Sequence, residues 1–337
     1  MTNAKQPSTS TEKTPDSVSI NAVDRAVEVA LRVVNAWAMG AGSAFEMTGN
    51  FLSGVLGAFG KVLNRIPVVG NILRGMCRWL GTIVSAGFDL IAMLTCCAVN
   101  IASNGLAGMV RVLIGVLRVI FARDGRLVRK GVADIFAGIA GAVIAVVAKT
   151  VALIHAVIFM QMGERPLNDH EKAIVARIYR NSIAVKNVRI IDGFAGLFST
   201  NNRPFTLGNR IYMKQIASAK DPALFAHECC HIWQYQREGV RYIAEALWAQ
   251  FFVKNAYSWE TEIARGKMHW QDFNREAQAQ FILNLFNDGR RKPPALTAGE
   301  FFDDDPIGNN VEYKRSGVDH TELAQKSIVF IRNKGIS

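Results

Sequence analysis

The chain has 337 residues, of which 50% are hydrophobic and 20% charged, and its formal net charge is +11. No motif that reads DNA or RNA accompanies this charge, so we set nucleic acid aside and expect an anionic membrane surface as the partner. The five cysteines include two pairs of sequence neighbours, which argues against a disulfide framework and favours folding in a reducing cytosol.

The first 163 residues differ in composition from the rest of the chain. Residues 1–19 are polar and lack the apolar core and small-residue cleavage site of a Sec signal peptide, so we expect a disordered tail. Residues 20–163 are rich in Ala, Val, Leu, Ile and Gly, with sparse charges. This composition predicts an apolar, basic helical region that associates with a membrane.

Two runs in this region approach the length of about 20 residues that crosses a bilayer. Residues 90–110 are uncharged, and residues 135–162 contain only Lys149 and His155 as ionisable side chains. A soluble bundle whose apolar helices pack on one another is the alternative, because short apolar runs do not distinguish these cases. Both interpretations stay open at the level of sequence.

Between these runs, residues 111–132 combine apolar turns with repeated basic residues. The pattern is typical of an amphipathic segment that lies on anionic lipid. Residues 51–84 have a similar pattern, and Pro67 followed by Gly70 predicts a break between two helices there. The basic residues of the first segment are Arg111, Arg118, Arg123, Arg126, Arg129 and Lys130.

After residue 163 the sequence changes to that of a small α+β domain. Asn168 begins a capping-box arrangement that predicts a helix start. Residues 188–192 are rich in β-branched residues, and Gly208-Asn209 between two β-prone runs predicts a hairpin. Asp221 is suited to cap the helix that follows, and this helix contains the motif HECCH.

The motif HECCH brings two histidines and a glutamate together. His227 and His231 are four residues apart, so on a helix they lie on one face and can point at one ion. Two neutral imidazoles suit Zn²⁺. Glu228 lies about 100° around the helix from His227, where it can act as the general base of a zinc peptidase. The sequence therefore predicts zinc at His227 and His231, with Glu228 catalytic.

The cysteines inside the motif are also metal-ligand residue types. Cys229 and Cys230 lie roughly 100° apart on a helix, so both cannot reach the histidine face, and we interpret them as small core residues. The glycine and third histidine of metzincins are absent, because Gln234 and Arg237 occupy those positions.

A third zinc ligand must come from elsewhere in the chain. Glu276 is favoured because it begins a second helical pattern, and a glutamate on a helix crossing the first is the gluzincin arrangement. Glu245 is too far along a continuous helix unless the chain turns at Gly239. Glu262 is the next candidate, and the others are Glu260, His269 and Asp272.

Residues 165–285 match a known family in several places. They resemble the HExxH-bearing zincin-like peptidase domain of bacterial contractile-injection-system and polymorphic-toxin proteins. The resemblance implies a zincin-like fold, supports Glu276 as a ligand and suggests Gln278 as an accessory residue. Cys229-Cys230 depart from the small or apolar residues usual there. The matching positions are Val188, Arg189, 205–209, Ile211, Tyr212, 226–228, His231 and Gln234.

These observations predict a mainly α protein: an apolar helical region followed by a zincin-like α+β domain over residues 164–288 and a C-terminal tail over residues 289–337. The expected function is that of a zinc-dependent metallopeptidase, gluzincin-like, acting as a membrane-associated bacterial effector or toxin that leaves the cell by a non-Sec route. Its partners would be a peptide or protein substrate, an anionic membrane, and secretion machinery or an immunity protein. Candidates to stabilise the oxyanion are Tyr235, Tyr242 and Tyr257.

A function from another class fits the same residues. The zinc helix can be structural, in a non-catalytic module that inserts into membranes or docks to secretion machinery. A change of Glu228 to Gln separates the two, because only a peptidase loses an activity while it keeps its metal.

Overall fold

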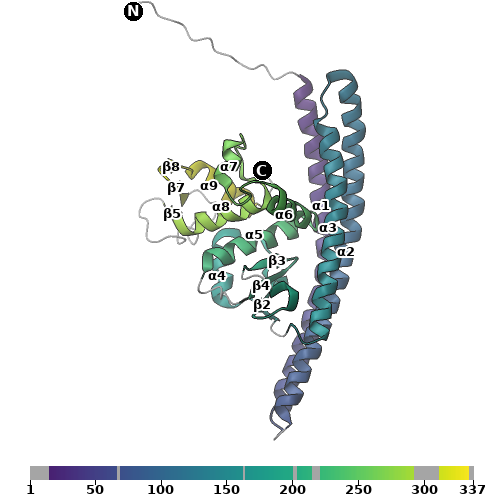
Figure 1. Ribbon diagram of the computed structural model, residues 1–337, viewed down its shortest axis with the longest axis vertical. Helices are drawn as coiled ribbons and strands as arrows, with labels where there is room; N and C mark the ends of the chain where they lie inside the picture. Colours follow the sequence, from purple (N-terminus) through teal and green to yellow (C-terminus); the bar gives the residue numbers. More distant parts are fainter. Residues whose placement is uncertain are drawn as a thin grey trace, which may run out of the picture.

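The computed structural model describes residues 15–66, 69–161, 164–199, 203–214, 221–291 and 311–333 (Figure 1). These residues are mostly helical with a few short strands, which confirms the prediction of a mainly α protein. Three long helices form a bundle on one side, and the rest of the described chain packs beside the middle of that bundle. We call this second part the sheet domain.

The bundle consists of α1 (Pro15–Leu63), α2 (Gly70–Ala122) and α3 (Arg126–Val157), which run up and down beside one another (Figure 1). The predicted break between two helices is confirmed by the turn between α1 and α2. Because α1 begins at Pro15, the end of the tail predicted to be disordered is helical. Residues 1–14 lie outside the described residues.

Glycines let these helices approach closely. A Cβ on Gly108 of α2 would overlap the backbone of Gly131 on α3. Between α1 and α2, a Cβ on Gly49 would meet the Cβ of Phe88 at 2.6 Å. Small residues therefore set the spacing of the three helices.

The sheet of the second part has four strands in the order β1 (Glu164–Pro166), β2 (Arg189–Asp192), β4 (Arg210–Lys214) and β3 (Phe205–Leu207). The predicted strand and hairpin are thus confirmed: β3 and β4 are antiparallel, and Gly208 turns between them with φ +65°. Only β2 and β4 pair in parallel. This arrangement places β1 and β3 at the two edges of the sheet, and β3 is the edge strand beside β4.

Helices cover this sheet around one hydrophobic core. The capping box at Asn168 is confirmed, because its side chain accepts from Glu171 N while Glu171 accepts from Asn168 N. The 3₁₀ turns in the described part of this domain are η1 (Arg180–Ser182), η2 (Val185–Asn187), η3 (Gly196–Ser199) and η4 (Trp270–Asp272). The α-helices are α4 (Asp169–Tyr179), α5 (Pro222–Glu238), α6 (Arg241–Phe252), α7 (Trp259–Ala264), α8 (Arg275–Asp288) and α9 (Thr321–Arg332).

The prediction of a C-terminal tail from residue 289 is wrong for the described residues there. Short strands β5 (Arg290–Arg291) and β6 (Val311–Glu312) pair, and β7 (Lys314–Arg315) pairs with β8 (Val318–Asp319). Helix α9 then buries its apolar face in the domain core through Ala324, Ile328 and Ile331. The carbonyl of Ile331 accepts a hydrogen bond from Trp233 of α5 at 3.2 Å, so the end of the chain supports the helix with the motif.

Bundle and sheet domain share a second hydrophobic core. Met93 and Cys97 of α2 and Ala142 and Ala145 of α3 pack in one cluster with side chains of the sheet and of α5 and α6. At Gly141 the backbone of Val240 lies so close that a Cβ would overlap its carbonyl oxygen. The domain-side members include Ile191, Leu207, Tyr212, Tyr235, Tyr242 and Ile243.

Buried charges reinforce this junction. Lys149 is 1% exposed, pairs with Asp89 at 2.5 Å and donates to the carbonyl of Leu207 at 3.0 Å. Asp89 also pairs with Arg210 of the sheet. The sequence suggested Lys149 as a cation within a membrane run, but its ammonium is turned to the sheet domain.

The basic segment at residues 111–132 is also arranged differently from the expectation. It is divided between the end of α2 and the start of α3, with a turn in which Arg123 has φ 53°. Arg111 is fully buried and pairs with Asp24, Glu28 and Asp134, so it does not face lipid. By length and composition α2 and α3 could each cross a membrane, a test that core helices of soluble proteins also pass.

Candidate metal centre

The helix α5 forms as its sequence predicts. Asp221 accepts a hydrogen bond from Leu224 N at 2.8 Å, and Pro222 occupies the first turn, where its missing N–H costs nothing. His227 and His231 lie one turn apart with ring centroids 5.1 Å from each other. Both are buried, with 5% and 7% of their surface exposed.

Glu276 comes to this pair from α8, which packs across α5. Asn274 caps α8 by accepting from the N–H groups of Glu276 and Ala277, which fixes Glu276 in the first turn. Its Oε2 lies 3.8 Å from His227 Nε2 and 3.6 Å from His231 Nε2. Among the described residues these three side chains form the one cluster of His, Cys, Asp and Glu whose ligand atoms, all within 4.8 Å of one another, could hold a metal ion.

The donor set fits zinc. In a tetrahedral site with Zn–N bonds near 2.0 Å, neighbouring ligand atoms lie about 3.3 Å apart, so the distances here need only a small contraction. His231 Nδ1 is 2.8 Å from Gln234 Oε1, an amide oxygen that accepts the Nδ1 proton. This leaves Nε2 of His231 to face the centre, as a neutral imidazole ligand requires.

Besides Gln234, two glutamines support the ligands through hydrogen bonds: Gln278 and Gln250. Gln234 donates to Gln278 Oε1 at 2.8 Å, and Gln278 in turn donates to the carbonyl of Phe273. Gln278 therefore holds the residue that orients His231, which gives the suggested accessory residue a structural role. Gln250 of α6 donates to Glu276 Oε1 at 2.8 Å, leaving Oε2 directed at the histidines.

The electrostatics of the cluster favour an ion pair between protonated His231 and ionised Glu276, with His227 neutral. Burial lowers the pKa of His231, but the Glu276 carboxylate outweighs burial and raises that pKa to about 9. Burial and the charge of His231 lower the pKa of His227 to about 3. Burial raises the pKa of Glu276, yet the positive His231 reverses this and lowers it to about 2. A metal cation would take the place of the His231 proton opposite Glu276.

Glu228 lies beside the cluster and is held by the edge strand. Thr206 Oγ1 donates to Glu228 Oε2 at 2.8 Å, and Glu228 is only 3% exposed. Tyr242 donates to the Thr206 carbonyl at 3.2 Å. The strand β3 thereby positions the carboxylate that the sequence assigned as the general base.

The structure ranks the three tyrosines. Tyr235 is directed at the bundle, with its hydroxyl 3.8 Å from the sulfur of Met93. The Tyr242 ring lies 6.2 Å from His231, but its hydroxyl is engaged by β3. The Tyr257 ring lies 6.4 Å from His227, and burial and the Glu276 carboxylate raise the pKa of its phenol above the ordinary value. Tyr257 is therefore the one of the three whose hydroxyl lies at the cluster, beside Glu276.

The other acidic candidates have other partners. Glu262 pairs with Arg265 and Lys267 and accepts from Asn274 N, so it supports the start of α8. Glu245 pairs with Arg241 and Arg275. Glu260 pairs with Arg315, while His269 directly precedes η4 and Asp272 ends it. Neither His269 nor Asp272 joins the metal-ligand cluster.

The cysteines of the motif are core residues, as the sequence suggested. Cys229 and Cys230 are 1% and 0% exposed and belong to the hydrophobic core of the sheet domain. All five cysteines are free thiols. Cys229 and Cys230 thus help to pack α5 and take no part in the metal-ligand cluster.

Two residues of the site were not predicted from sequence. Thr206 and Gln250 are brought to Glu228 and Glu276 by strand and helix packing. The position of Thr206 in the hairpin that precedes the motif could have indicated its role in the site. Gln250 lies in a helix whose sequence has no metal-binding pattern. No protein-family model, curated protein or solved structure matches this chain.

Proposed function

We propose that this protein is a zinc-dependent peptidase of the gluzincin type that works at a membrane. The observation that supports it most directly is the convergence of His227, His231 and Glu276 from two helices, with Glu228 held beside them. The resemblance of residues 165–285 to zincin-like domains of injection-system and toxin proteins favours a bacterial effector or toxin as the setting.

His227, His231 and Glu276 would hold the ion. When bound, zinc supplies a Lewis acid that polarises a peptide carbonyl and makes water a stronger acid. Glu228 accepts the proton of the attacking water and returns it to the leaving amine. Thr206 keeps that carboxylate in place, and Tyr257 can donate a hydrogen bond to the developing oxyanion.

The test compares wild-type protein with Glu228→Gln in the presence of one equivalent of zinc. We expect the wild type to cleave a mixture of unfolded peptides and Glu228→Gln to lose this cleavage while it keeps its zinc, measured by mass spectrometry. If both proteins bind zinc and neither cleaves, the structural-zinc function replaces the peptidase. A Glu228→Gln variant as active as wild type would remove Glu228 from the mechanism.

A second pair of variants tests the metal itself. His227→Ala/His231→Ala should bind no zinc, because only one carboxylate of the cluster remains. Cys229→Ala is the matched control within the same helix and should keep its zinc, since this thiol packs in the core. Stoichiometric zinc in the double-histidine variant would contradict the site.

A further inference from the structure

The three helices of the bundle each present an apolar face that no other described part of the chain covers. With about 100° per residue, the exposed positions of each helix lie roughly half a turn from its buried positions. We call the combined exposed surface the outer face. Its most exposed apolar side chains include Trp37 (78%), Phe51 (69%), Leu106 (60%), Leu113 (69%), Phe136 (68%) and Val143 (57%).

The outer face contains no charge along its middle. In the central parts of the helices the charged side chains Glu46, Asp89, Arg111, Asp134 and Lys149 are buried, and Arg32 is half-buried in a pocket that Trp233 and Arg237 of the sheet domain also line. Three of them bond to the sheet domain: Glu46 to Asn209, Asp89 to Arg210 and Asp134 to Arg241; Lys149 donates to a carbonyl of that domain. The charges of the bundle are thus turned inward, and the opposite face is left apolar.

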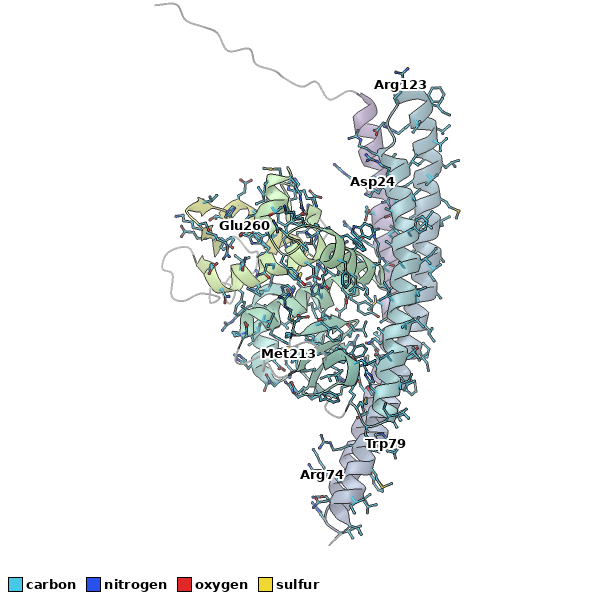
Figure 2. All side chains as sticks on the ribbon, in the orientation of Figure 1. Asp24, Arg74, Trp79, Arg123, Met213 and Glu260 are labelled. Carbon is cyan, nitrogen blue, oxygen red and sulfur yellow. The ribbon has the colours of Figure 1, made fainter. Side chains whose placement is uncertain are left out.

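Both ends of the bundle are basic. Figure 2 shows Arg123 at one end and Arg74 near the other, with the sheet domain between them. Lys61, Arg65 and Arg78 lie with Arg74 at the turn between α1 and α2, and Arg118, Arg126 and Arg129 lie with Arg123. From Arg78 to Arg118 along α2 is about 60 Å of helix. A strip of this length and the width of one helix, about 10 Å, covers about 600 Å², which exceeds the patches of a few hundred Å² on soluble monomers.

We propose that the outer face lies lengthwise in the surface of an anionic bilayer, with the sheet domain and its metal centre on the aqueous side. Basic residues at both ends attract anionic headgroups, while the apolar middle enters the acyl boundary. A second copy of the chain is disfavoured as the partner of the outer face. Whether two copies aligned in parallel or antiparallel, a basic end of one would lie against a basic end of the other. This orientation rests on the proposed membrane attachment and needs no part of the metal chemistry.

A spanning orientation conflicts with the packing of α3. The sheet domain contacts this helix at Asp134, Gly141, Lys149 and His155, through Arg241, Val240, Leu207 and Leu197. The first and last of these positions are separated by 21 steps along the helix, or about 31 Å, which matches the thickness of the hydrocarbon core. If α3 crossed the bilayer, the charged surface of the sheet domain would lie in the acyl region.

The first arm of the test measures vesicle flotation of the full chain. The vesicles contain three parts phosphatidylcholine to one part phosphatidylglycerol. We expect wild type to float and Phe136→Glu/Val143→Glu to float about tenfold less, because two carboxylates enter the acyl boundary. Met268→Glu/Val318→Glu is the matched control: it adds the same charge at exposed apolar positions of the sheet domain and should float like wild type. Glu228→Gln should float as well, which separates this proposal from the peptidase.

The second arm distinguishes lying from spanning. The five native cysteines are buried, so Lys61→Cys and Arg126→Cys place one accessible thiol at either end of the bundle. On vesicles, both thiols should react with an impermeant maleimide added outside. Protection of one end would establish spanning and overturn the proposal. Flotation of Phe136→Glu/Val143→Glu equal to that of wild type would also overturn the proposal. The same holds if wild type does not bind vesicles and instead forms a dimer that Phe136→Glu/Val143→Glu dissociates.

Discussion

Thr206 on the edge strand donates a hydrogen bond to the carboxylate of Glu228, with 2.8 Å between Thr206 Oγ1 and Glu228 Oε2. This bond joins the hairpin to the helix with the zinc motif. Thr206→Val keeps the shape of the side chain and removes the donor. We expect peptide cleavage to fall about 10- to 100-fold with zinc content unchanged, because Glu228 is no longer held beside the reacting water. Thr206→Ser keeps the hydroxyl and should retain most of the activity in the same assay.

The two buried glutamates near the start of α8 make a matched pair. Glu276 and Glu262 are each 1% exposed, but only Glu276 lies beside His227 and His231. Glu276→Ala should weaken zinc affinity by more than about a hundredfold in a competition titration with a chelator. Glu262→Ala should leave zinc affinity near wild type and lower the melting temperature, because Asn274 N, Arg265 and Lys267 lose their partner. Wild-type zinc affinity in Glu276→Ala would refute the third ligand.

Glu46 makes the stability of the junction depend on pH. Burial and the Asp89 carboxylate raise the pKa of Glu46 from 4.5 to about 7, against the opposing effect of Arg210 and Lys149. Between these values the folded protein binds more protons than the unfolded chain. The contribution of this group to stability is therefore complete below pH 4.5 and is lost as the pH rises to about 7.

The variant Glu46→Gln tests this pH dependence. It keeps an oxygen to accept from Asn209 and removes the titration. We expect the difference in melting temperature between pH 5 and pH 7.5, which covers most of the range from 4.5 to about 7, to shrink in Glu46→Gln. An unchanged difference would assign the pH dependence to other groups.

Gly141 tests how closely bundle and sheet domain must approach. A Cβ there overlaps the carbonyl oxygen of Val240, whereas Gly40 of α1 has nothing within 4 Å. Gly141→Ala should lower the free energy of unfolding by about 1–3 kcal/mol, since the backbone must shift. Gly40→Ala, the matched control, should raise it by up to about 1 kcal/mol through helix propensity. The free energy of unfolding of both variants is measured by urea denaturation. A Gly141→Ala variant more stable than wild type would show that the backbone at the junction can shift without cost.

The local elements followed from the sequence. Some local elements depend only on residues a few positions apart, so a short stretch of sequence is enough to predict them. These are the capping box at Asn168, the Gly208-Asn209 hairpin and the Asp221 cap. The i, i+4 spacing of His227 and His231 is of the same kind, because one helical turn places both on one face. Glu276 was the favoured partner among several acids, and only packing of α8 on α5 brought it to them.

Long-range packing decided the rest. The sequence around Lys149 resembles a membrane-spanning segment. The hydropathy of a segment does not include the contacts of Lys149 with Asp89 and Leu207, which lie far away in the chain. Thr206 gained its role from the packing of β3 against α5, and Gln250 gained its role from a helix that no motif connects to the metal centre. Helix α9 had the apolar spacing of Ala324, Ile328 and Ile331, but the core that receives it is built by residues far earlier in the chain. A sequence specifies periodicity and caps through local interactions, whereas the partner of a buried charge is chosen only when distant segments meet.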